Sequence, residues 1–267
     1  MSEYNAYPTQ QADSTSAGEQ AGPELTGPHS VPAERGAAWV FEGFDYFKAN
    51  PLGWIGALVV LFVISAMVSL IPLGGLAFNI VSPVLTAGLM LGCHQYREGG
   101  VFSFNHLFAG FSDNVKELLL VGAILLGFSL LIAVVVVAVA AFTVVDFSAL
   151  SSGQIQQQLQ EQMLSDPAGL FLPFMTILFI IVALSAPLLM AFWFAPALVV
   201  LNRLSALEAM RLSFQGCLIN MVPFLFYGIV ALVVLFISMI PFGLGLLVTV
   251  PMMTASLYIG YRDIFTG

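Results

Sequence analysis

The sequence is poor in charge, and above all in positive charge. Only 8% of its 267 residues are Asp, Glu, Lys or Arg, and only seven are Lys or Arg. Soluble domains carry roughly 25% charged residues, so this chain cannot cover a water-facing surface with polar groups. The seven basic residues are also spread along the chain, which makes no basic patch for a nucleic acid. We therefore expect a membrane protein with no nucleic-acid partner.

Long uncharged runs fill most of the chain, and 59% of all residues are hydrophobic. An α-helix needs about 20 apolar residues to cross roughly 30 Å of hydrocarbon. The runs have no polar face, as a soluble helix would, and no alternation, as a β-barrel strand would. The sequence thus predicts an all-α integral membrane protein with six transmembrane helices, at residues 51–71, 75–95, 117–144, 169–200, 221–240 and 243–261.

Turn residues divide the six predicted helices into three hairpins, and an amphipathic stretch precedes each hairpin. The apolar stripes comprise Val40, Phe41, Phe44 and Phe47, then Phe104, Leu107, Phe108, Phe111 and Val115, then Leu204, Leu207, Met210 and Phe214. Such spacing is typical of helices in the membrane interface. A cytoplasmic extension packed on its neighbours is the alternative. We also predict helix N-caps at Asn50, which precedes Pro51, and at Asn114, which has Glu117 three residues on.

An internal repeat links the second helices of the three hairpins. Residues 83–92 align without gaps on residues 251–260 and are identical at five of ten positions, and a weaker copy begins at residue 187. The repeat positions are Pro83, Ala87, Gly88, Gly92, Pro187, Ala191, Pro251, Ala255, Ser256 and Gly260. Small residues four apart favour close helix packing. Prolines in corresponding helices can mark a transport site or a bend needed for packing, and we favour packing.

The repeat defines three units at about 36–98, 103–201 and 203–263, within a six-helix domain over residues 35–267. Residues 1–34 hold five acidic and no basic residues and almost no large aliphatic ones. We therefore predict a disordered acidic cytoplasmic tail, with a docking peptide for a partner as the alternative. No apolar segment lies near Met1, so we expect no cleavable signal peptide.

Chemistry-bearing residues are scarce. The predicted spans contain no Asp, Glu, Lys, Arg or His in their interiors, which argues against proton-coupled transport and acid–base catalysis at depth. Cys93, His94 and His106 could approach one another as metal ligands, but no CxxC or HxxxH spacing accompanies them. Cys93 and Cys217 are predicted to be small buried residues without a disulfide. We expect no enzymatic activity and no catalytic, cofactor-binding or metal-binding residue.

Several short motifs carry a resemblance to a family. They are Trp39-x-x-Glu-Gly-Phe, Asn50-Pro51, Pro83-x-x-Thr-Ala-Gly, Phe108-x-Gly-Phe and Ala195-Pro-Ala-Leu-Val-Val. Over about residues 35–263 the chain resembles the YciC-like inner-membrane proteins of proteobacteria. More distantly it is similar to the membrane domain attached to some glycerophosphodiester phosphodiesterases. The resemblance implies six helices and an inner-membrane location, and it brings no catalytic residues.

Two functions remain open at this point. The first is a non-enzymatic scaffold or accessory protein in membrane or envelope organisation, with membrane lipid and another membrane protein as partners. The second is a channel or carrier for a small neutral or apolar solute. A polar mid-membrane cavity lined by Asn79, Thr86 and Thr254 would favour the second. A solid core with a lipid-lined groove would favour the first.

The distribution of Lys and Arg predicts the topology. When the chain is followed through six crossings, all seven fall on the side of the N-terminus, which places both termini in the cytoplasm. A reporter fused after Gly267 should therefore report cytoplasm, and one inserted near Ser152 should report periplasm. Two reporters on the same side would contradict the six-crossing topology.

Overall fold

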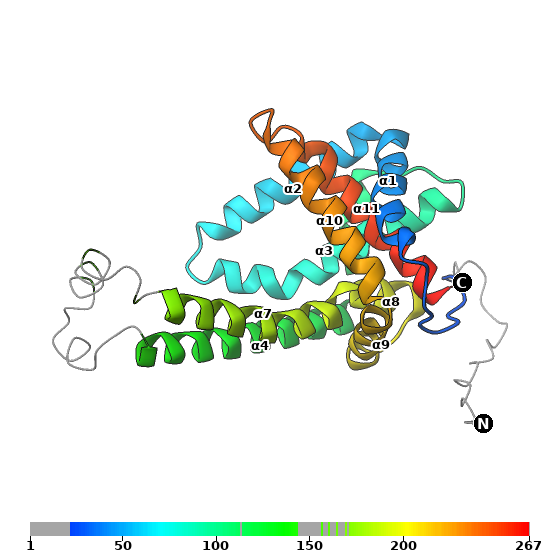
Figure 1. Ribbon diagram of the computed structural model, residues 1–267. Helices are drawn as coiled ribbons and strands as arrows, with labels where there is room; N and C mark the ends of the chain where they lie inside the picture. The colour runs from blue at the N-terminus through cyan, green and yellow to red at the C-terminus, as the bar shows by residue number, and fades with distance from the viewer. Residues whose placement is uncertain are drawn as a thin grey trace, which may run out of the picture.

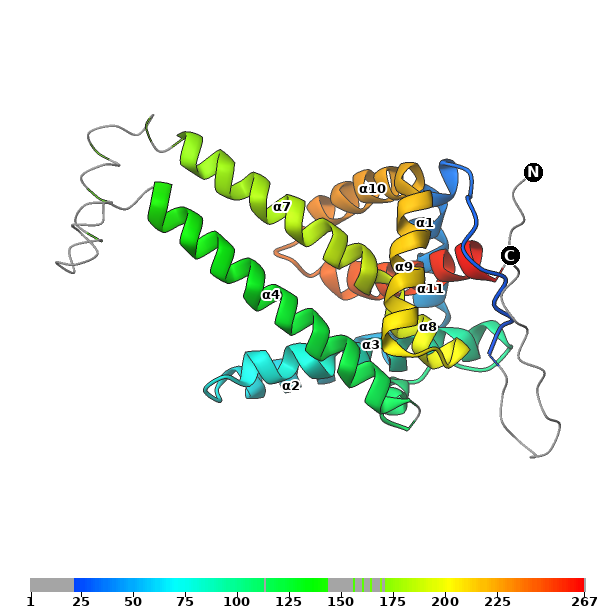
Figure 2. The same cartoon turned by 90° about the horizontal axis from the view of Figure 1, so that it is seen from below.

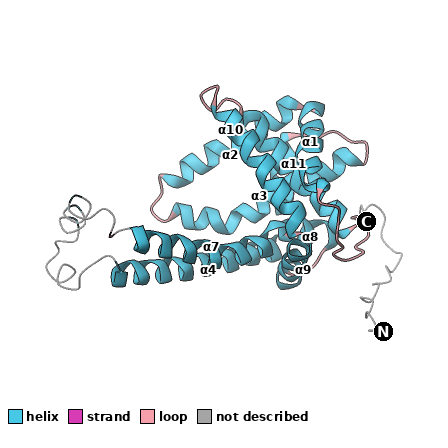
Figure 3. Cartoon of the chain, viewed as in Figure 1, coloured by secondary structure: helices cyan, strands magenta, loops and turns pink. Residues whose placement is uncertain are grey.

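The computed structural model describes residues 22–112, 114–143 and 171–266, with the single residues 156, 160, 164 and 169. This part of the chain folds into helices and no strands, which confirms the all-α prediction (Figure 3). The helices are α1 (Glu34–Ala49), α2 (Pro51–Ser69), α3 (Gly74–Arg97), the 3-10 helix η1 (Phe104–Phe111), α4 (Val115–Thr143), α7 (Phe171–Trp193), α8 (Ala195–Asn202), α9 (Ala206–Ile219), α10 (Met221–Met239) and α11 (Leu246–Phe265).

Five stretches of the described chain are long and apolar enough to cross a bilayer, namely Pro51–Ser69, Gly74–Arg97, Val115–Phe142, Phe171–Asn202 and Met221–Met239. The helix α11, which holds most of the sixth predicted crossing, is not among them. It carries buried polar side chains such as Thr249 and Ser256 and packs against α1. A helix that faces protein needs fewer apolar residues than one that faces lipid. The sixth crossing therefore stays a prediction.

The helices divide into a compact part and projecting hairpins (Figures 1 and 2). We call the compact part the base: it consists of α1, η1, α8 and α9 with the adjoining ends of α3 and α11. The hairpin of α4 and α7 extends far from it, and no residue in the most apolar window of α4 is buried. The largest fully buried side chains, including Trp39, Trp54, Phe194 and Phe265, lie in or next to the base. The base therefore holds the core.

The base is a closed ring of three contacts between repeat units. In each contact, the second helix of one unit receives the amphipathic element of the next unit. Thus η1 packs on α3, α9 packs on α7, and α1 packs on α11. The last contact joins the third unit back to the first, so the three units close on themselves. A ring of this kind explains why the small residues of the repeat recur in the second helix of each unit.

The amphipathic elements have one face on protein and another exposed. In α1, Trp39 and Val40 are buried in the core, whereas Phe41 is 60% exposed and Phe44 39% exposed. In η1, Leu107 is buried and the aromatic residues on either side of it are exposed. Both elements therefore pack on a neighbour and also present large apolar side chains outward. Their position in the membrane interface stays a prediction. The second element is a 3-10 helix and not an α-helix.

An asparagine at the start of each hairpin binds the segment that leads into the next unit. Asn50 caps α2 as predicted, since its side chain accepts a hydrogen bond from the Gly53 N–H at 3.0 Å. Its amide also donates to the Phe102 carbonyl at 2.7 Å, just before η1. Asn220, whose role the sequence did not reveal, donates to the His29 carbonyl at 2.9 Å, just before α1.

At the start of the second hairpin, Asn114 and Glu117 do not form the predicted helix cap. The Asn114 amide donates to the Val199 carbonyl in α8 at 3.2 Å. The Glu117 carboxylate accepts the Ala206 N–H at 2.7 Å, at the N-terminus of α9. A carboxylate at a helix N-terminus accepts a hydrogen bond from a free N–H and interacts favourably with the positive end of the helix dipole. Glu117 thus caps the helix of the next unit and not its own.

Residues 22–33 form a strap across the base, in a segment predicted to be part of a disordered tail. The Thr26 N–H donates to the Phe265 carbonyl at 2.9 Å, and the His29 N–H donates to the Ile264 carbonyl at 3.0 Å. The Val31 N–H donates to the Asn220 side chain at 2.9 Å. These bonds satisfy backbone groups on both sides. The tail prediction therefore does not hold for residues 22–33, and residues 1–21 lie outside the described chain.

The strap yields a stability prediction. Deleting residues 2–33 should destabilise the protein by about 1–3 kcal/mol, because it leaves Asn220 and the last carbonyls of α11 without these partners. Deleting residues 2–21 keeps every bond of the strap and serves as the matched control. Thermal unfolding in detergent compares the two variants with the parent. Equal melting of both deletions and the parent would contradict the role of the strap.

Candidate functional site

Small residues of the repeat lie where backbone meets backbone. At the contact of α3 with η1, a Cβ added to Gly88 would lie 2.3 Å from the His106 carbonyl oxygen. A Cβ added to Gly110 would lie 2.1 Å from the Val84 carbonyl oxygen. Both distances are far shorter than van der Waals contact. Only glycine allows η1 to approach α3 so closely.

The contact of α11 with α1 has the same register. A Cβ added to Gly43 would lie 2.3 Å from the Met252 carbonyl oxygen and 3.1 Å from the Ser256 nitrogen. Met252 follows the repeat proline directly, as Val84 does in the first unit, and Ser256 corresponds to Gly88. Gly43 and Gly110 also share a local pattern, Phe-x-Gly-Phe, which the sequence analysis noted only for the second of them.

The third contact uses a serine in place of the glycine. The Ser213 hydroxyl on α9 donates to the Met190 carbonyl at 2.7 Å and accepts the Phe194 N–H at 2.9 Å. Phe194 lies between α7 and α8, where Pro196 lacks the N–H that a continuous helix needs. Ser213 thus bridges a helix break. Pro187 is exposed and Ala191 only partly buried, so the middle copy of the repeat packs less tightly.

The remaining repeat residues pack against side chains of the base. Pro83, Ala87, Pro251 and Ala255 are buried. Gly92 faces the Phe102 ring, and Gly260 faces the Trp39 ring. The partner of the small-residue face is therefore the amphipathic element of the next unit and its neighbours.

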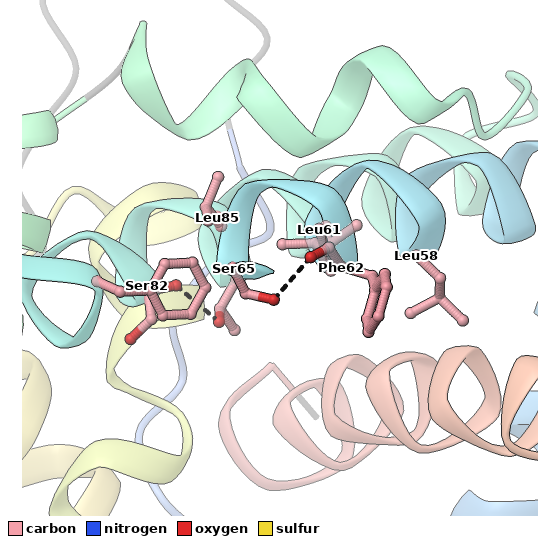
Figure 4. Close-up of a pocket in the computed structure, with 9 residues that line it drawn as sticks. Leu58, Leu61, Phe62, Ser65, Ser82 and Leu85 are labelled. Atoms are coloured by element: carbon pink, nitrogen blue, oxygen red, sulfur yellow. Dashed lines mark hydrogen bonds between the residues drawn. The ribbon is translucent and has the colours of Figure 1, made fainter. Parts of the chain in front are cut away.

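A groove of about 400 Å³ lies between α2 and α3 (Figure 4). Its walls include Leu58, Leu61, Phe62 and Leu85, and the hydroxyls along it are directed to backbone carbonyls of their own helices. For example, Ser65 donates to the Phe62 carbonyl at 2.9 Å. The groove therefore presents an almost wholly apolar surface.

The three polar residues that were expected to line a carrier cavity do not come together in this groove. Of Asn79, Thr86 and Thr254, only Thr86 lines it. Asn79 donates to the Gly75 carbonyl at 2.8 Å, Thr86 to the Ser82 carbonyl at 3.0 Å, and Thr254 to the Val250 carbonyl at 2.9 Å. Hydroxyls bonded to their own helix are satisfied without a ligand.

A second cavity, of about 320 Å³, is polar and lies in the base between α1, α3 and α11. On one wall, Arg35 forms ion pairs with Glu42 and Asp263, both at 2.6 Å. The Trp39 indole N–H also donates to Asp263, at 2.7 Å. The hydrogen bonds to Glu42 and then to Asp263 raise the pKa of Arg35 above its usual value. This network fixes the first helix of the chain to its last, and sequence spacing gave no sign of it.

Tyr46 lines the same cavity from α1. Its ring packs edge-on against Tyr96 and Tyr258, with centroids 4.9 Å and 6.1 Å away. Burial raises the pKa of Tyr46 to about 12. Its hydroxyl therefore stays protonated at neutral pH and remains a hydrogen-bond donor.

The residues considered as metal ligands have other partners. The Nδ1 atom of His94 lies 2.9 Å from the Tyr258 hydroxyl. His106 contacts Ser103 and the side chain of Gln95. Among the described residues, no three His, Cys, Asp or Glu side chains lie together as a metal site would require. Cys93 and Cys217 are buried free thiols, which confirms the prediction for both.

Comparison with known proteins identifies one relative. The chain is 28% identical over 208 residues to a "Probable inner membrane protein" of Burkholderia thailandensis, covering 74% of this chain and 73% of the relative. No family model matches the chain, and no solved structure matches it either. The chain is thus similar to a probable inner-membrane protein. With five apolar helices in the part of the chain that the structure describes, it is a multi-pass membrane protein.

The glycine contacts predict that Gly→Ala substitutions change the stability in opposite directions at buried and at open positions. Gly43→Ala and Gly110→Ala should each destabilise the protein by about 1–3 kcal/mol, because the added methyl meets a backbone carbonyl. Gly127→Ala and Gly228→Ala are the matched controls, since nothing lies within 4 Å of a Cβ at either helical position. These should be neutral or stabilising by up to about 1 kcal/mol. Thermal unfolding in detergent measures all four, and equal melting of the two pairs would contradict close packing in the ring.

Proposed function

We propose that the chain is a non-enzymatic scaffold or accessory protein of the bacterial inner membrane that acts in membrane or envelope organisation. One observation carries this proposal: the apolar helices α2, α4, α7 and α10 project from a closed base and leave most of their surface free for lipid, whereas α3 is half buried. Only 6% of the most apolar window in Phe171–Asn202 is buried, and 17% of that in Pro51–Ser69. Large exposed apolar surfaces in a membrane protein contact lipid or another membrane protein.

The distribution of charge supports a six-crossing topology for this proposal, with both termini in the cytoplasm. All seven Lys and Arg residues lie in the base or at helix ends that adjoin it. The described start of the chain and the end of α11 also lie at this end of the molecule (Figure 1). The excess of positive charge would place the base in the cytoplasm. A kinship with the YciC-like proteins, suggested by the motifs above, belongs to the same proposal.

A carrier for an apolar solute is the second candidate, and the groove between α2 and α3 favours it. The groove is apolar and large enough to hold an acyl chain or a small apolar molecule. A pathway for a small neutral polar solute has less support, because the hydroxyls along the groove are bonded to their own helices. The scaffold role therefore ranks first.

Vesicle and cell measurements together test the proposed function. Vesicles that contain the purified protein should swell in glycerol at the same rate as protein-free vesicles. Cells that lack the protein should become sensitive to detergent, and the parent should restore resistance. A Gly43→Leu variant should not restore it, because a bulky side chain opens the base.

Groove-filling variants separate the two candidates. Ser65→Trp and Ser82→Trp place a large ring in the groove and leave the base intact. A solute flux that depends on the protein and falls in these variants would overturn the scaffold role in favour of a carrier. Normal detergent resistance in cells that lack the protein would also contradict a scaffold role in the envelope.

A further inference from the structure

The polar cavity of the base gathers basic residues in a chain that has few. Three of the seven Lys and Arg residues line it, one from each of three helices: Arg35 from α1, Arg97 from α3 and Arg262 from α11. These residues are up to 227 positions apart in the sequence, since 262 − 35 = 227. The ring of repeat units brings the three helices together.

Two of the three arginines form no ion pair with any of the described acidic residues. Within the described ranges the ion pairs are those of Arg35 with Glu42 and Asp263, and one between Lys48 and Asp45. Arg97 and Arg262 take part in none of them. Arg97 lies near the phenol of Tyr46, which also lines the cavity, and Arg262 lies near the phenol of Tyr258.

The charge balance of the cavity specifies the ligand class. Three arginines contribute +3 and the two carboxylates contribute −2, which leaves +1 at neutral pH. Because Arg35 already binds both carboxylates, the excess charge lies on Arg97 and Arg262. A guanidinium group presents paired N–H donors that match the spacing of phosphate oxygens. The balance favours a ligand with one negative charge, as a phosphodiester has.

The exposed face of α1 predicts that the cavity lies near the lipid headgroups. Its wall is built partly by α1, whose Phe41 and Phe44 side chains are exposed on the outside of the base. Exposed aromatic residues on an amphipathic helix are typical of an element in the headgroup region. The volume of about 320 Å³ is sufficient for a phosphate with a small polar substituent.

We propose that Arg97 and Arg262 bind the phosphate group of a singly charged phosphodiester or phosphate ester in this cavity. The source is either the headgroup of an anionic lipid, such as phosphatidylglycerol, or a soluble phosphate ester. The proposal goes beyond the scaffold role and does not depend on it, because it concerns a binding site and not what the protein assembles.

The experiment uses the full-length protein in nanodiscs. Thermal unfolding is measured in phosphatidylcholine alone and in phosphatidylcholine mixed with phosphatidylglycerol. The parent should melt at a higher temperature in the mixture, because a ligand that binds only the folded state stabilises it. Arg97→Gln and Arg262→Gln should each weaken this binding roughly ten- to a hundredfold, since each removes a charged hydrogen-bond donor.

Arg211→Gln is the matched control: it removes the same charge from an exposed arginine outside the cavity. It should keep the full shift. Melting in phosphatidylcholine alone shows whether each variant is folded, and the double variant Arg97→Gln/Arg262→Gln should then melt equally in both membranes. An equal loss of the shift in all single variants, or no shift in the parent, would overturn the site.

A soluble arm distinguishes the two sources. Glycerophosphoglycerol, the soluble phosphodiester that remains when both acyl chains of phosphatidylglycerol are removed, is added to the parent and to the same variants in phosphatidylcholine nanodiscs. A shift with phosphatidylglycerol but not with glycerophosphoglycerol supports a lipid headgroup as the ligand. A shift with the soluble ester that Arg97→Gln abolishes supports a soluble ligand. A soluble-ester shift that survives Arg97→Gln and Arg262→Gln would contradict the proposed residues.

Discussion

The fold depends on close backbone contact between the second helix of each unit and the amphipathic element of the next. Close approach of two backbones increases the number of dispersion contacts between them and brings polar groups within short range. Gly43 and Gly110 permit this approach at carbonyls one residue beyond a proline. A methyl group added at either glycine would push the two elements apart and weaken the packing of the amphipathic element on its partner helix.

The largest fully buried side chains lie in or next to the base, although the first two hairpins also pack on each other through α3 and α4, where a Cβ added to Gly122 would lie 2.2 Å from the Ile80 carbonyl oxygen. Large aromatic residues such as Trp39, Phe194 and Phe265 fill the base. The Trp39 and Phe194 rings pack on Phe224 of α10, with centroids 5.6 Å and 5.8 Å away, and Phe194 packs on Phe265 at 5.4 Å. The apolar ends of the hairpins project beyond that core into the lipid. Cooperative stability therefore resides in the base, and the surfaces of the hairpins are free to serve lipid or protein contacts.

The sequence predicted what is local and missed what is distant. Hydropathy predicted the long helices, Asn50 before Pro51 predicted a true cap, and the repeat includes Gly88, which lies in close contact with η1. Hydrophobic periodicity shows which face of a helix is apolar, but it does not show which distant segment that face contacts. It could not show that Glu117 caps α9 or that Arg35 pairs with Asp263. The strap was missed because composition alone suggested disorder, although Asn220 supplies it with hydrogen bonds from the folded base.

The contact that closes the ring differs from the other two because it joins opposite ends of the chain. Additional interactions gather there: the strap on the end of α11, the Arg35 network and the Trp39–Asp263 bond. At the other two contacts the paired elements follow each other closely in the chain, but no short loop joins α11 to α1. Specific polar bonds must therefore favour the closed ring over an open arrangement. The same contact brings α1 and α11 beside α3 and so creates the arginine cavity. Closure of the fold and formation of the candidate anion site are therefore one structural event.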